Sequence, residues 1–306
     1  MEYVLGIDGG GTKTHLVAMD KAMKILYEGY GGSSNLTSLT SGEVDRNLSE
    51  LLGAFFANRN FSPRDCACLC LGTAGAGRET ARLELKTMLN RWANQVLVTD
   101  DAQSALAGAT ETGSGILLIA GTGSICYARN QRGESHRTGG WGHIAGDEGS
   151  GYDMACQILR AVVRAADGRG SETQLTDLVM DFWSLTGIDQ LIDALYRSGK
   201  GKSEIAALAI LCDKAYDKQD KTAFQIMDKC AAGLAEMVIA AADVFGEEKC
   251  IPCICSGSLL EKSRYFQSHL RRHLELKKPE VQLAPKLHDA AWGCARMAWN
   301  HAEYTE

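Results

Sequence analysis

The segment Asp8-Gly9-Gly10-Gly11-Thr12-Lys13-Thr14 places a carboxylate, three glycines, two hydroxyls and a lysine between two apolar runs. Consecutive glycines let the backbone approach a bulky anion and point its N–H groups toward it. Thr12 and Thr14 add hydroxyl donors, Lys13 adds positive charge, and a carboxylate at Asp8 can hold Mg²⁺ through water. The segment predicts a phosphate-binding turn, although a tight hairpin without a ligand fits the same residues.

This segment fits neither of two common nucleotide-binding motifs. A Walker P-loop needs Gly-Lys-Ser/Thr at the start of a helix, whereas here the order is Thr-Lys-Thr and a strand is expected next. The dinucleotide-binding motif needs a third glycine where Thr14 stands. Any phosphate contact must therefore come from a glycine turn inside a hairpin.

A second glycine turn, Gly121-Thr122-Gly123-Ser124, lies between the apolar runs 116–120 and 125–129. Taken alone it fits an ordinary turn, but its backbone and hydroxyl donors also suit a phosphate. It repeats the strand–glycine turn–strand order of the N-terminus. Two such turns at corresponding points of a duplicated unit predict that both contact one polyphosphate.

Two adjacent carboxylates, Asp100 and Asp101, follow the apolar run 95–99 and precede a helical stretch, 102–109. Ligands of α/β proteins bind at the carboxyl ends of strands. One carboxylate can accept a proton from an attacking hydroxyl, and the other can cap the helix. Capping by both is the alternative.

The most glycine-rich stretch, Gly139–Gly151, cannot be the interior of a helix. Trp141 can pack against a sugar ring or a neighbouring strand, and His143 fits a structural role better than a catalytic one. Asp147 is a candidate for hydrogen bonds to sugar hydroxyls. Glu148 either shares that role or begins the next helix.

A turn of small residues, Ser256-Gly257-Ser258, joins a predicted strand to a predicted helix. Gly257 permits the close approach of a flat ring such as adenine. A plain strand–helix turn fits the same residues equally well.

Hydrophobic periodicity predicts the elements that position these residues. Strands are expected at 3–8, 15–20, 24–28, 66–71, 95–99, 116–120, 125–129, 251–255 and 281–284. Helices are expected at 43–58, 79–92, 102–109, 152–166, 173–183, 202–216, 221–245, 259–274 and 289–301. A polar, turn-rich linker near 110–116 separates two halves, so we expect an α/β protein of two lobes.

Composition and charge exclude several classes of protein. A net charge of −6 and a pI of about 5.7 argue against a nucleic-acid partner, which usually meets a basic face. The N-terminus lacks a basic, apolar and cleavable signal, and no apolar run is long enough for a membrane span. We therefore expect a cytoplasmic protein with no membrane partner.

Eleven cysteines need an explanation in a cytoplasmic chain of 306 residues. A reducing compartment disfavours disulfides. Cys66, Cys68 and Cys70 alternate, which in a regular strand places all three on one face; Cys250, Cys253 and Cys255 form a second group. Small apolar side chains on buried strands are the favoured interpretation, and a metal or iron–sulfur site is the alternative.

The five segments with candidate functional residues together resemble the sugar-kinase, heat-shock-70 and actin superfamily. They are Asp8–Thr14, Asp100-Asp101, Gly121–Ser124, Gly139–Gly151 and Ser256–Ser258. Within this superfamily, Gly139–Tyr152 resembles the kinase side of a family that unites N-acetylglucosamine kinases with ATPases that activate benzoyl-CoA reductase and 2-hydroxyacyl-CoA dehydratases. The likeness spans nearly the whole chain, to Asp289-Ala290-Ala291-Trp292-Gly293. Within this family, the chain most resembles bacterial kinases for N-acetylmuramic acid and N-acetylglucosamine.

The resemblance implies a fold and an activity. The fold is two actin-like, ribonuclease H-like lobes with a duplicated mixed-sheet core and an ATP cleft between them, at 1–113 and 114–288, with a terminal helix, 289–306, that packs back on the first lobe. The activity is phosphorylation of an amino sugar at its 6-hydroxyl with ATP and Mg²⁺. A homodimer is implied as well.

Residue roles follow from matching positions. Asp101 is implied as the catalytic base, because the family aspartate is followed by alanine. The candidate sugar contacts are Asn35, Ser124, Gly140, Trp141, Gly142, Asp147 and Glu148. The candidate ATP contacts are Gly10, Gly11, Thr12, Lys13, Thr122, Gly123, Gly257 and Ser258, with Asp8 for Mg²⁺. Ser-Gly-Ser replaces the family's glycine pair at the adenosine turn, and Cys294 replaces a common alanine.

Three alternatives remain open. The sugar can be N-acetylglucosamine, N-acetylmuramic acid or free glucosamine, because the pocket for the acetyl or lactyl group is not visible in the sequence. The chain can instead be an ATP-driven activator of a radical dehydratase, which needs a [4Fe–4S] cluster between two subunits. It can also be a catalytically silent sugar sensor.

Overall fold

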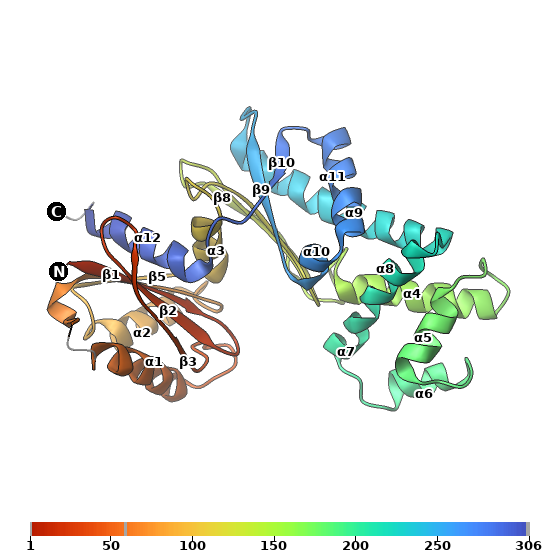
Figure 1. Cartoon of the computed structure of the whole chain (residues 1–306), viewed down its shortest axis with the longest axis horizontal. Coiled ribbons are helices and arrows are strands. Elements are labelled where there is room, and N and C mark those ends of the chain that lie inside the picture. Colours follow the sequence, from red (N-terminus) through yellow and green to blue (C-terminus); the bar gives the residue numbers. More distant parts are fainter. Residues whose placement is uncertain (1, 58–59, 304–306) are drawn as a thin grey trace. The chain divides into compact units, whose positions relative to one another are not determined.

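The structure is a computed structural model that describes residues 2–57 and 60–303. The chain divides into two compact units (Figure 1): unit 1 comprises Met1–Ser114 and Pro285–Glu306, and unit 2 comprises Gly115–Ala284. Each unit is built on one five-stranded mixed sheet flanked by helices, which confirms the predicted α/β class. The sequence predicted that the second lobe begins at 114 and ends at 288, whereas unit 2 begins at Gly115 and ends at Ala284.

Unit 1 contains a sheet of order β3-β2-β1-β4-β5. Its strands are β1 (Tyr3–Gly9), β2 (Thr14–Met19), β3 (Ile25–Gly31), β4 (Cys66–Thr73) and β5 (Gln95–Thr99). Its helices are α1 (Ser41–Phe56), α2 (Glu79–Leu89), α3 (Asp101–Ala109) and α12 (Ala290–Glu303), and a 3₁₀ turn spans Pro63–Asp65.

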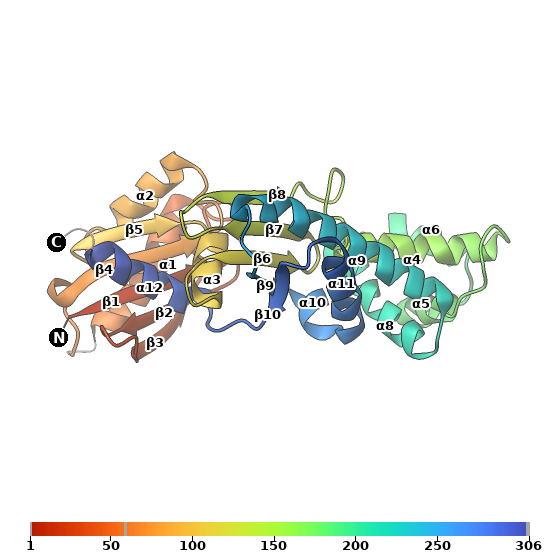
Figure 2. The ribbon, with the colours of Figure 1, turned by 90° about the horizontal axis from the view of Figure 1, so that it is seen from above.

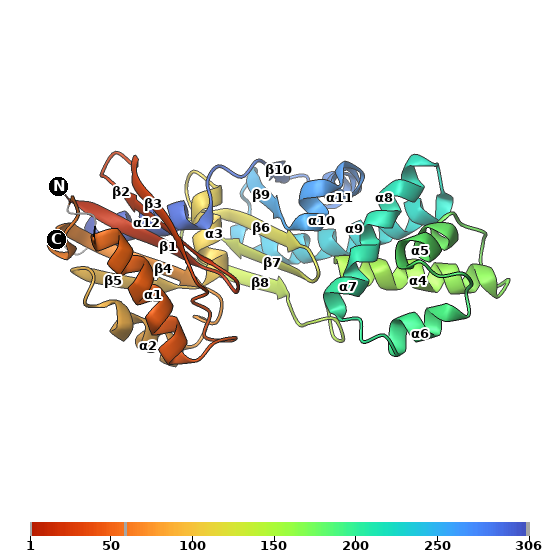
Figure 3. The same cartoon turned by 60° about the horizontal axis from the view of Figure 1, so that its bottom comes forward.

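The central strands of the unit 1 sheet, β1, β2 and β4, are buried on both faces. Apolar residues of α1 and α2 pack with Tyr3 and Leu5 on one face, and Figure 3 shows both helices there. On the other face α12 lies across β1 and β4 and contacts α3. Because each face is covered, β1 and β2 read as nearly continuous apolar runs rather than alternating ones.

Unit 2 contains a sheet of order β10-β9-β6-β7-β8. Its strands are β6 (Gly115–Ala120), β7 (Ser124–Arg129), β8 (Ser135–Gly139), β9 (Ile251–Ser256) and β10 (Val281–Ala284). Its helices are α4 (Gly151–Ala166), α5 (Leu175–Trp183), α6 (Gln190–Tyr196), α7 (Lys202–Ala206), α8 (Ile210–Asp217), α9 (Lys221–Ala241), α10 (Ser258–Lys262) and α11 (Arg264–Lys277), with 3₁₀ turns at Ala207–Ala209 and Ala242–Phe245. Figure 2 shows α9 running beside β7 and β8.

The two sheets have the same topology. In unit 1, β1 pairs antiparallel with β2 and parallel with β4. In unit 2, β6 pairs antiparallel with β7 and parallel with β9. The duplicated strand–glycine turn–strand unit predicted from sequence is therefore present in both.

Some predicted elements differ from the observed ones. The sequence prediction missed β8 and α6. Because β8 is the counterpart of β3, the duplication could have been used to predict β8. The helix predicted over 202–216 tightens to 3₁₀ geometry at Ala207–Ala209. The helix predicted over 259–274 is broken at Ser263, whose hydroxyl accepts a hydrogen bond from the N–H of Phe266 at 3.1 Å and caps a new helix.

The prediction that three alternating cysteines share one face of a strand is wrong. Cys66 packs with the α1 side of the sheet, whereas Cys68 and Cys70 pack with the α12 side. The cause is an irregularity in pairing: Tyr3 is opposite Cys66, but Leu5 is opposite Leu69, so β4 has one extra residue there. A β-bulge of this kind reverses the faces of the residues beyond it.

The approach of α12 to its neighbours depends on glycine. A Cβ atom on Gly293 would lie 2.1 Å from the Ser104 carbonyl oxygen, and one on Gly6 would lie 2.2 Å from the Ala291 carbonyl oxygen. Both contacts are with backbone, which cannot move aside as a side chain can. The C-terminal helix therefore packs backbone against backbone.

Among the residues that the structure describes, no helix has the length and apolar character needed to cross a membrane.

We expect Gly293→Ala to lower the free energy of unfolding of the protein by about 1–3 kcal/mol or more, as overpacking does. The matched control is Gly53→Ala in α1, where a Cβ atom meets nothing within 4 Å. That change should leave stability unchanged or raise it by up to about 1 kcal/mol. Urea denaturation of both variants tests this, and equal stabilities would contradict the packing described here.

Candidate functional site

The β1–β2 turn exposes part of the predicted phosphate-binding segment. The Gly10 N–H donates to the Lys13 carbonyl oxygen at 3.0 Å, and the Thr12 and Lys13 side chains are exposed. Thr14 is buried, and its hydroxyl donates to the Gly32 carbonyl oxygen at 2.6 Å. Thr14 therefore serves the hairpin itself, contrary to the expectation that its hydroxyl adds a donor for an anion.

Asn35, a predicted sugar contact, lies beside this turn. Its Oδ1 accepts hydrogen bonds from the N–H and the hydroxyl of Thr37, at 2.8 and 2.7 Å. Its Nδ2 is 3.8 Å from the position that a Cβ on Gly11 would occupy. The Ser33 hydroxyl donates to the Gly10 carbonyl oxygen at 3.0 Å, which ties the same segment to the turn. The structure thus brings together Asn35 and the glycine turn.

Two further carboxylates of unit 1 act on Asp8. Burial, and then the charges of Asp289 and Asp101, raise the pKa of Asp8. Burial and the neighbouring Asp100 raise the pKa of Asp101, although its side chain reaches solvent. Raised pKa values at Asp8 and Asp101 are typical of carboxylates that hold a cation or a proton.

The two adjacent aspartates have different partners. Asp100 precedes α3 as its N-cap, and its Oδ1 accepts the Gln103 N–H at 2.8 Å. Asp101 is the first residue of the helix, and its Oδ1 accepts the Ala102 N–H at 3.0 Å. The Asp100 carboxylate therefore has the capping role, which leaves Asp101 as the more accessible proton acceptor.

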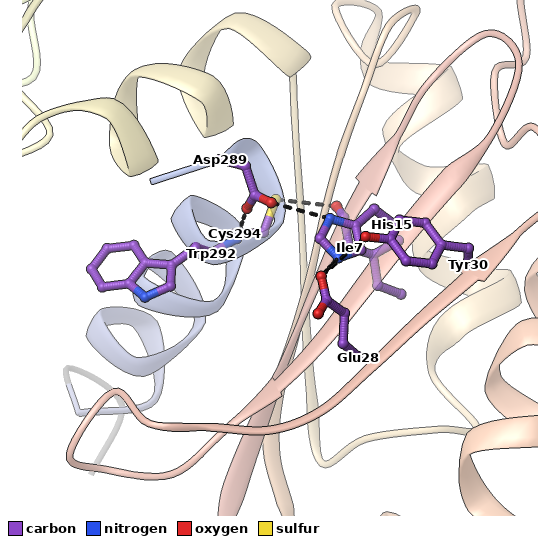
Figure 4. Close-up of polar contacts among 7 residues, drawn as sticks. All are labelled: Ile7, His15, Glu28, Tyr30, Asp289, Trp292 and Cys294. Carbon is purple, nitrogen blue, oxygen red and sulfur yellow. Dashed lines mark hydrogen bonds and ion pairs between the residues drawn. The ribbon is translucent and has the colours of Figure 1, made fainter. Parts of the chain in front are cut away.

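His15, directly opposite Asp8 across β1 and β2, joins three elements (Figure 4). Its Nε2 is 2.7 Å from Glu28 Oε1 on β3, and its Nδ1 is 3.3 Å from Asp289 Oδ2 before α12. The Tyr30 ring stacks on the imidazole with 4.5 Å between ring centres. The hydrogen bond to Asp289 raises the pKa of His15, and the same bond holds the pKa of Asp289 at about 2.

In unit 2 the β6–β7 turn is held against the start of α4. The Gly151 N–H donates to the Gly121 carbonyl oxygen at 2.8 Å, and the Tyr152 N–H donates to the Thr122 carbonyl oxygen at 3.3 Å. The Ser124 hydroxyl donates to the Glu148 carbonyl oxygen at 2.7 Å. These contacts place the predicted phosphate turn beside the predicted sugar loop.

Asp147 is the buried acid of that loop. Its backbone φ is 63°, in the left-handed region, and its side chain is 6% exposed. Its Oδ1 accepts the Ser124 N–H at 3.3 Å, and its Oδ2 is 2.5 Å from Lys202 Nζ. Sequence analysis did not single out Lys202. The available signal was Gly201-Lys202-Ser203 at the start of a helix, although Tyr196 stands where a Walker P-loop has its first glycine.

Two predicted sugar contacts in the loop Gly139–Gly151, Trp141 and Glu148, have exposed side chains. Gly140 and Gly142 have φ of 70° and 82°, which favours glycine. Trp141 is 70% exposed, with the guanidinium carbon of Arg137 4.7 Å from its ring centre. Glu148 is exposed too. These side chains are accessible to a ligand.

A cavity of about 420 Å³ lies within unit 2. Gly121 and Thr122 of the predicted phosphate turn and Ser258 of the predicted adenosine turn all line it, while Gly123 and Gly257 are not among its lining residues. Gly257 has a φ of 95°, and a Cβ there would lie 2.5 Å from the Ala120 carbonyl oxygen, so this turn requires glycine. Sequence reasoning missed the other walls, from α5, α7, α8 and their connections: Phe182, Ser203, Ala206, Ala207, Ile210 and Asp213.

The cavity has the chemistry of a nucleoside site. Its walls are mostly apolar, with a few hydroxyls, the Asp213 carboxylate and the Lys262 ammonium, which suits a flat base and a ribose. Backbone and hydroxyl groups of Gly121 and Thr122 at one wall suit a phosphate.

The cysteines, all of which the structure describes, are free thiols. Cys250 is exposed, Cys156 and Cys255 are half-buried, and the others are buried. Burial raises the pKa of the Cys126 thiol to about 12, which keeps it protonated and inert. Within residues 2–57 and 60–303, no cluster of three or more His, Cys, Asp or Glu side chains is arranged to hold a metal.

Comparison with known proteins gives one family and several relatives. Residues 5–298 match the model of the BadF/BadG/BcrA/BcrD ATPase family. The chain is 38% identical over 301 residues to the N-acetylmuramic acid/N-acetylglucosamine kinase of Clostridium acetobutylicum, covering 97% of this chain and 98% of that protein. It is 28% identical over 313 residues to the N-acetyl-D-glucosamine kinase of Dictyostelium discoideum, covering 98% of each.

Solved structures show the same fold. A candidate N-acetylglucosamine kinase from Chromobacterium violaceum superposes with a TM-score of 0.70 at 23% identity, covering 97% of this chain and 99% of that one. A ROK family glucokinase from Streptomyces griseus superposes with a TM-score of 0.54 at 16% identity, covering 97% and 99%. The predicted actin-like sugar-kinase fold is therefore confirmed.

We expect His15→Gln to reduce stability in a pH-dependent way. A raised pKa of His15 stabilises the folded state below about pH 6.5, and this contribution is lost as the pH rises through the raised value. The lowered pKa of Asp289 stabilises the folded state above about pH 4, and this stabilisation is lost as the pH falls toward 2. The deficit should be about 1 kcal/mol near pH 5–6, because both carboxylates are half exposed.

Urea midpoints at pH 5.5 and pH 9 test this expectation for the wild type and the variant. The difference between the two proteins should shrink at pH 9. A difference that grew with pH would contradict the charged pairing of His15.

Proposed function

The chain belongs to the BadF/BadG/BcrA/BcrD ATPase family, and on that premise we propose that it uses ATP to phosphorylate an N-acetylated amino sugar. Supporting this substrate class is the 38% identity, over almost the full length of both chains, to a kinase named for N-acetylmuramic acid and N-acetylglucosamine. The structural observation that carries the proposal is the cavity in unit 2. Gly121, Thr122 and Ser258, singled out from two distant motifs, line it together.

Nucleotide binding is assigned to both glycine turns. The cavity takes the adenosine, with Gly257 and Ser258 at the strand–helix turn, and Thr122 and Gly123 contact the phosphates. Gly10, Gly11, Thr12 and Lys13 of the β1–β2 turn contact the phosphates from unit 1. The exposure of Thr12 and Lys13 supports this role.

Asp8 is assigned to Mg²⁺. Burial and two nearby carboxylates raise its pKa, so a bound cation would relieve an unfavourable charge there. A single carboxylate together with water and phosphate oxygens is a common Mg²⁺ environment. When bound, Mg²⁺ neutralises charge on the phosphate oxygens.

Asp101 is assigned as the general base. It accepts the proton of the sugar 6-hydroxyl as that oxygen bonds to the γ-phosphorus, and the bond from that phosphorus to the bridging oxygen of ADP breaks. A pKa raised by burial and by Asp100 favours this role, because a base works best when its pKa is near the working pH. Asn35, Ser124, Gly140, Trp141, Gly142, Asp147 and Glu148 are assigned to the sugar.

A cytoplasmic location and a homodimer complete the proposal. The rival activity, activation of a radical dehydratase, has less support, since the full-length relatives reported above are named as sugar kinases. Free glucosamine stays a rival substrate. A stretch of 187 residues, 60% of this chain, is 30% identical to a glucosamine kinase of Vibrio cholerae.

A panel of unphosphorylated sugars tests the substrate class. N-Acetylglucosamine, N-acetylmuramic acid, glucosamine and glucose are each supplied with Mg-ATP, and ADP release is followed by a coupled assay. Turnover should require an N-acetylated sugar, and NMR of the product should show phosphate on O6. Equal ADP release with and without sugar would reject the kinase, and a brown, iron-containing protein after anaerobic purification would favour the activator.

We expect Asp101→Asn to lower kcat by about 10²–10⁴-fold, the usual contribution of general-base catalysis. The matched control is Asp100→Asn, because asparagine is as good an N-cap as aspartate and should keep the helix start intact. That control should lose only a few-fold in kcat, because removal of the Asp100 charge lowers the pKa of Asp101 but leaves its carboxylate in place. An Asp101→Asn enzyme of near-normal rate would reject the role of Asp101 as the base.

A further inference from the structure

Lys202 and Asp147 form an ion pair that the proposed function leaves unused. Lys202 Nζ is 2.5 Å from Asp147 Oδ2, where the aspartate side chain is 6% exposed and the lysine side chain 31% exposed. The other aspartate oxygen, Oδ1, accepts the Ser124 N–H. A carboxylate this deeply buried needs a partner for its charge. Lys202 supplies that partner from α7.

This pair lies against the predicted phosphate turn. A Cβ atom on Gly123 would be 2.9 Å from Asp147 Oδ2, so only a glycine at 123 leaves room for the carboxylate. The oxygen that meets Lys202 is therefore also the oxygen packed on the β6–β7 turn. An anion bound by the backbone of this turn comes within reach of the Lys202 ammonium.

Lys202 also adjoins the wall of the nucleotide cavity. Ser203, the next residue, lines that cavity together with Gly121 and Thr122. A lysine has a flexible four-carbon stem and a compact charge with three donors, so its ammonium can move between two neighbouring anions. Asp147 is one anion in reach, and a phosphate at the turn is the other.

We propose that Lys202 is shared between the ATP phosphates and Asp147 and so couples nucleotide binding to amino-sugar binding. This rests on the proposed function, in which Asp147 accepts a sugar hydroxyl. While Lys202 holds Oδ2, that oxygen is a poor acceptor for a hydroxyl. A polyphosphate carries more charge than one carboxylate and draws the ammonium toward itself. Oδ2 then becomes available to the sugar, and sugar binding in turn favours the nucleotide-bound arrangement.

The test measures N-acetylglucosamine affinity by titration calorimetry with and without Mg-AMP-PNP. In the wild type, the nucleotide should strengthen sugar binding by about tenfold, an ordinary size for coupling between two sites. In Lys202→Met the ratio of the two affinities should fall to about one, and Mg-AMP-PNP should bind about tenfold more weakly. Lys202→Arg keeps a cation and should keep most of the ratio.

Lys200→Met is the matched control. Lys200 lies two residues earlier, with its Nζ 5.4 Å from the centre of the Trp183 ring and 3.1 Å from Ser198 Oγ, which accepts its hydrogen bond. The change removes the same charge from the same segment without touching Asp147. Its coupling ratio should equal that of the wild type.

The outcomes separate this proposal from the proposed function. The role of Lys202 is overturned if the affinity ratio of Lys202→Met equals that of the wild type. It is also overturned if the nucleotide does not change sugar affinity in the wild type, even if the protein is a kinase. Nucleotide-dependent sugar binding without phosphorylation rejects the kinase and leaves the coupling standing. If Lys202→Met does not fold, Lys202→Gln, which keeps a donor for Oδ2, replaces it as the neutral variant and faces the same criterion.

Discussion

Glycine backbone lies so close to other groups in both units that a Cβ atom would not fit. In unit 1 a Cβ on Gly9 would lie 2.3 Å from Ser34 Oγ, and Gly293 lets α12 settle on α3. In unit 2, Gly123 leaves room for the Asp147 carboxylate, and Gly257 leaves room for the backbone of β6. The turns that we assign to ATP and the helix that closes unit 1 depend on this close approach.

Each unit also places a carboxylate and a basic side chain beside its glycine turn. In unit 1, Asp8 faces His15 across the first hairpin, and the imidazole is held between Glu28 and Asp289. In unit 2, Asp147 holds Lys202 beside the second hairpin. Asp147 is a buried carboxylate, which is costly without a partner, so its ion pair with Lys202 offsets that cost.

The duplicated topology explains why similar turns serve similar ligands. Both sheets place an antiparallel hairpin next to a parallel pair, so each glycine turn is at the edge where α/β proteins bind ligands. What differs is the insertion between β8 and β9. Its helices form the cavity walls in unit 2, whereas in unit 1 the described residues between β3 and β4 form α1 and a short 3₁₀ turn.

Local signals in the sequence were enough for the two hairpins, the α/β class and the glycine turns, because turn chemistry and periodicity are properties of neighbouring residues. The choice of Asp101 over Asp100 came from the family resemblance instead. Local signals did not reveal the bulge in β4, the internal use of the Thr14 hydroxyl or the partner of Asp147. Each of those features depends on which distant segment of the chain packs alongside; Lys202, for example, is distant in sequence from Asp147. Hydrophobic periodicity does not predict such contacts. Tertiary structure alone decided which charges meet.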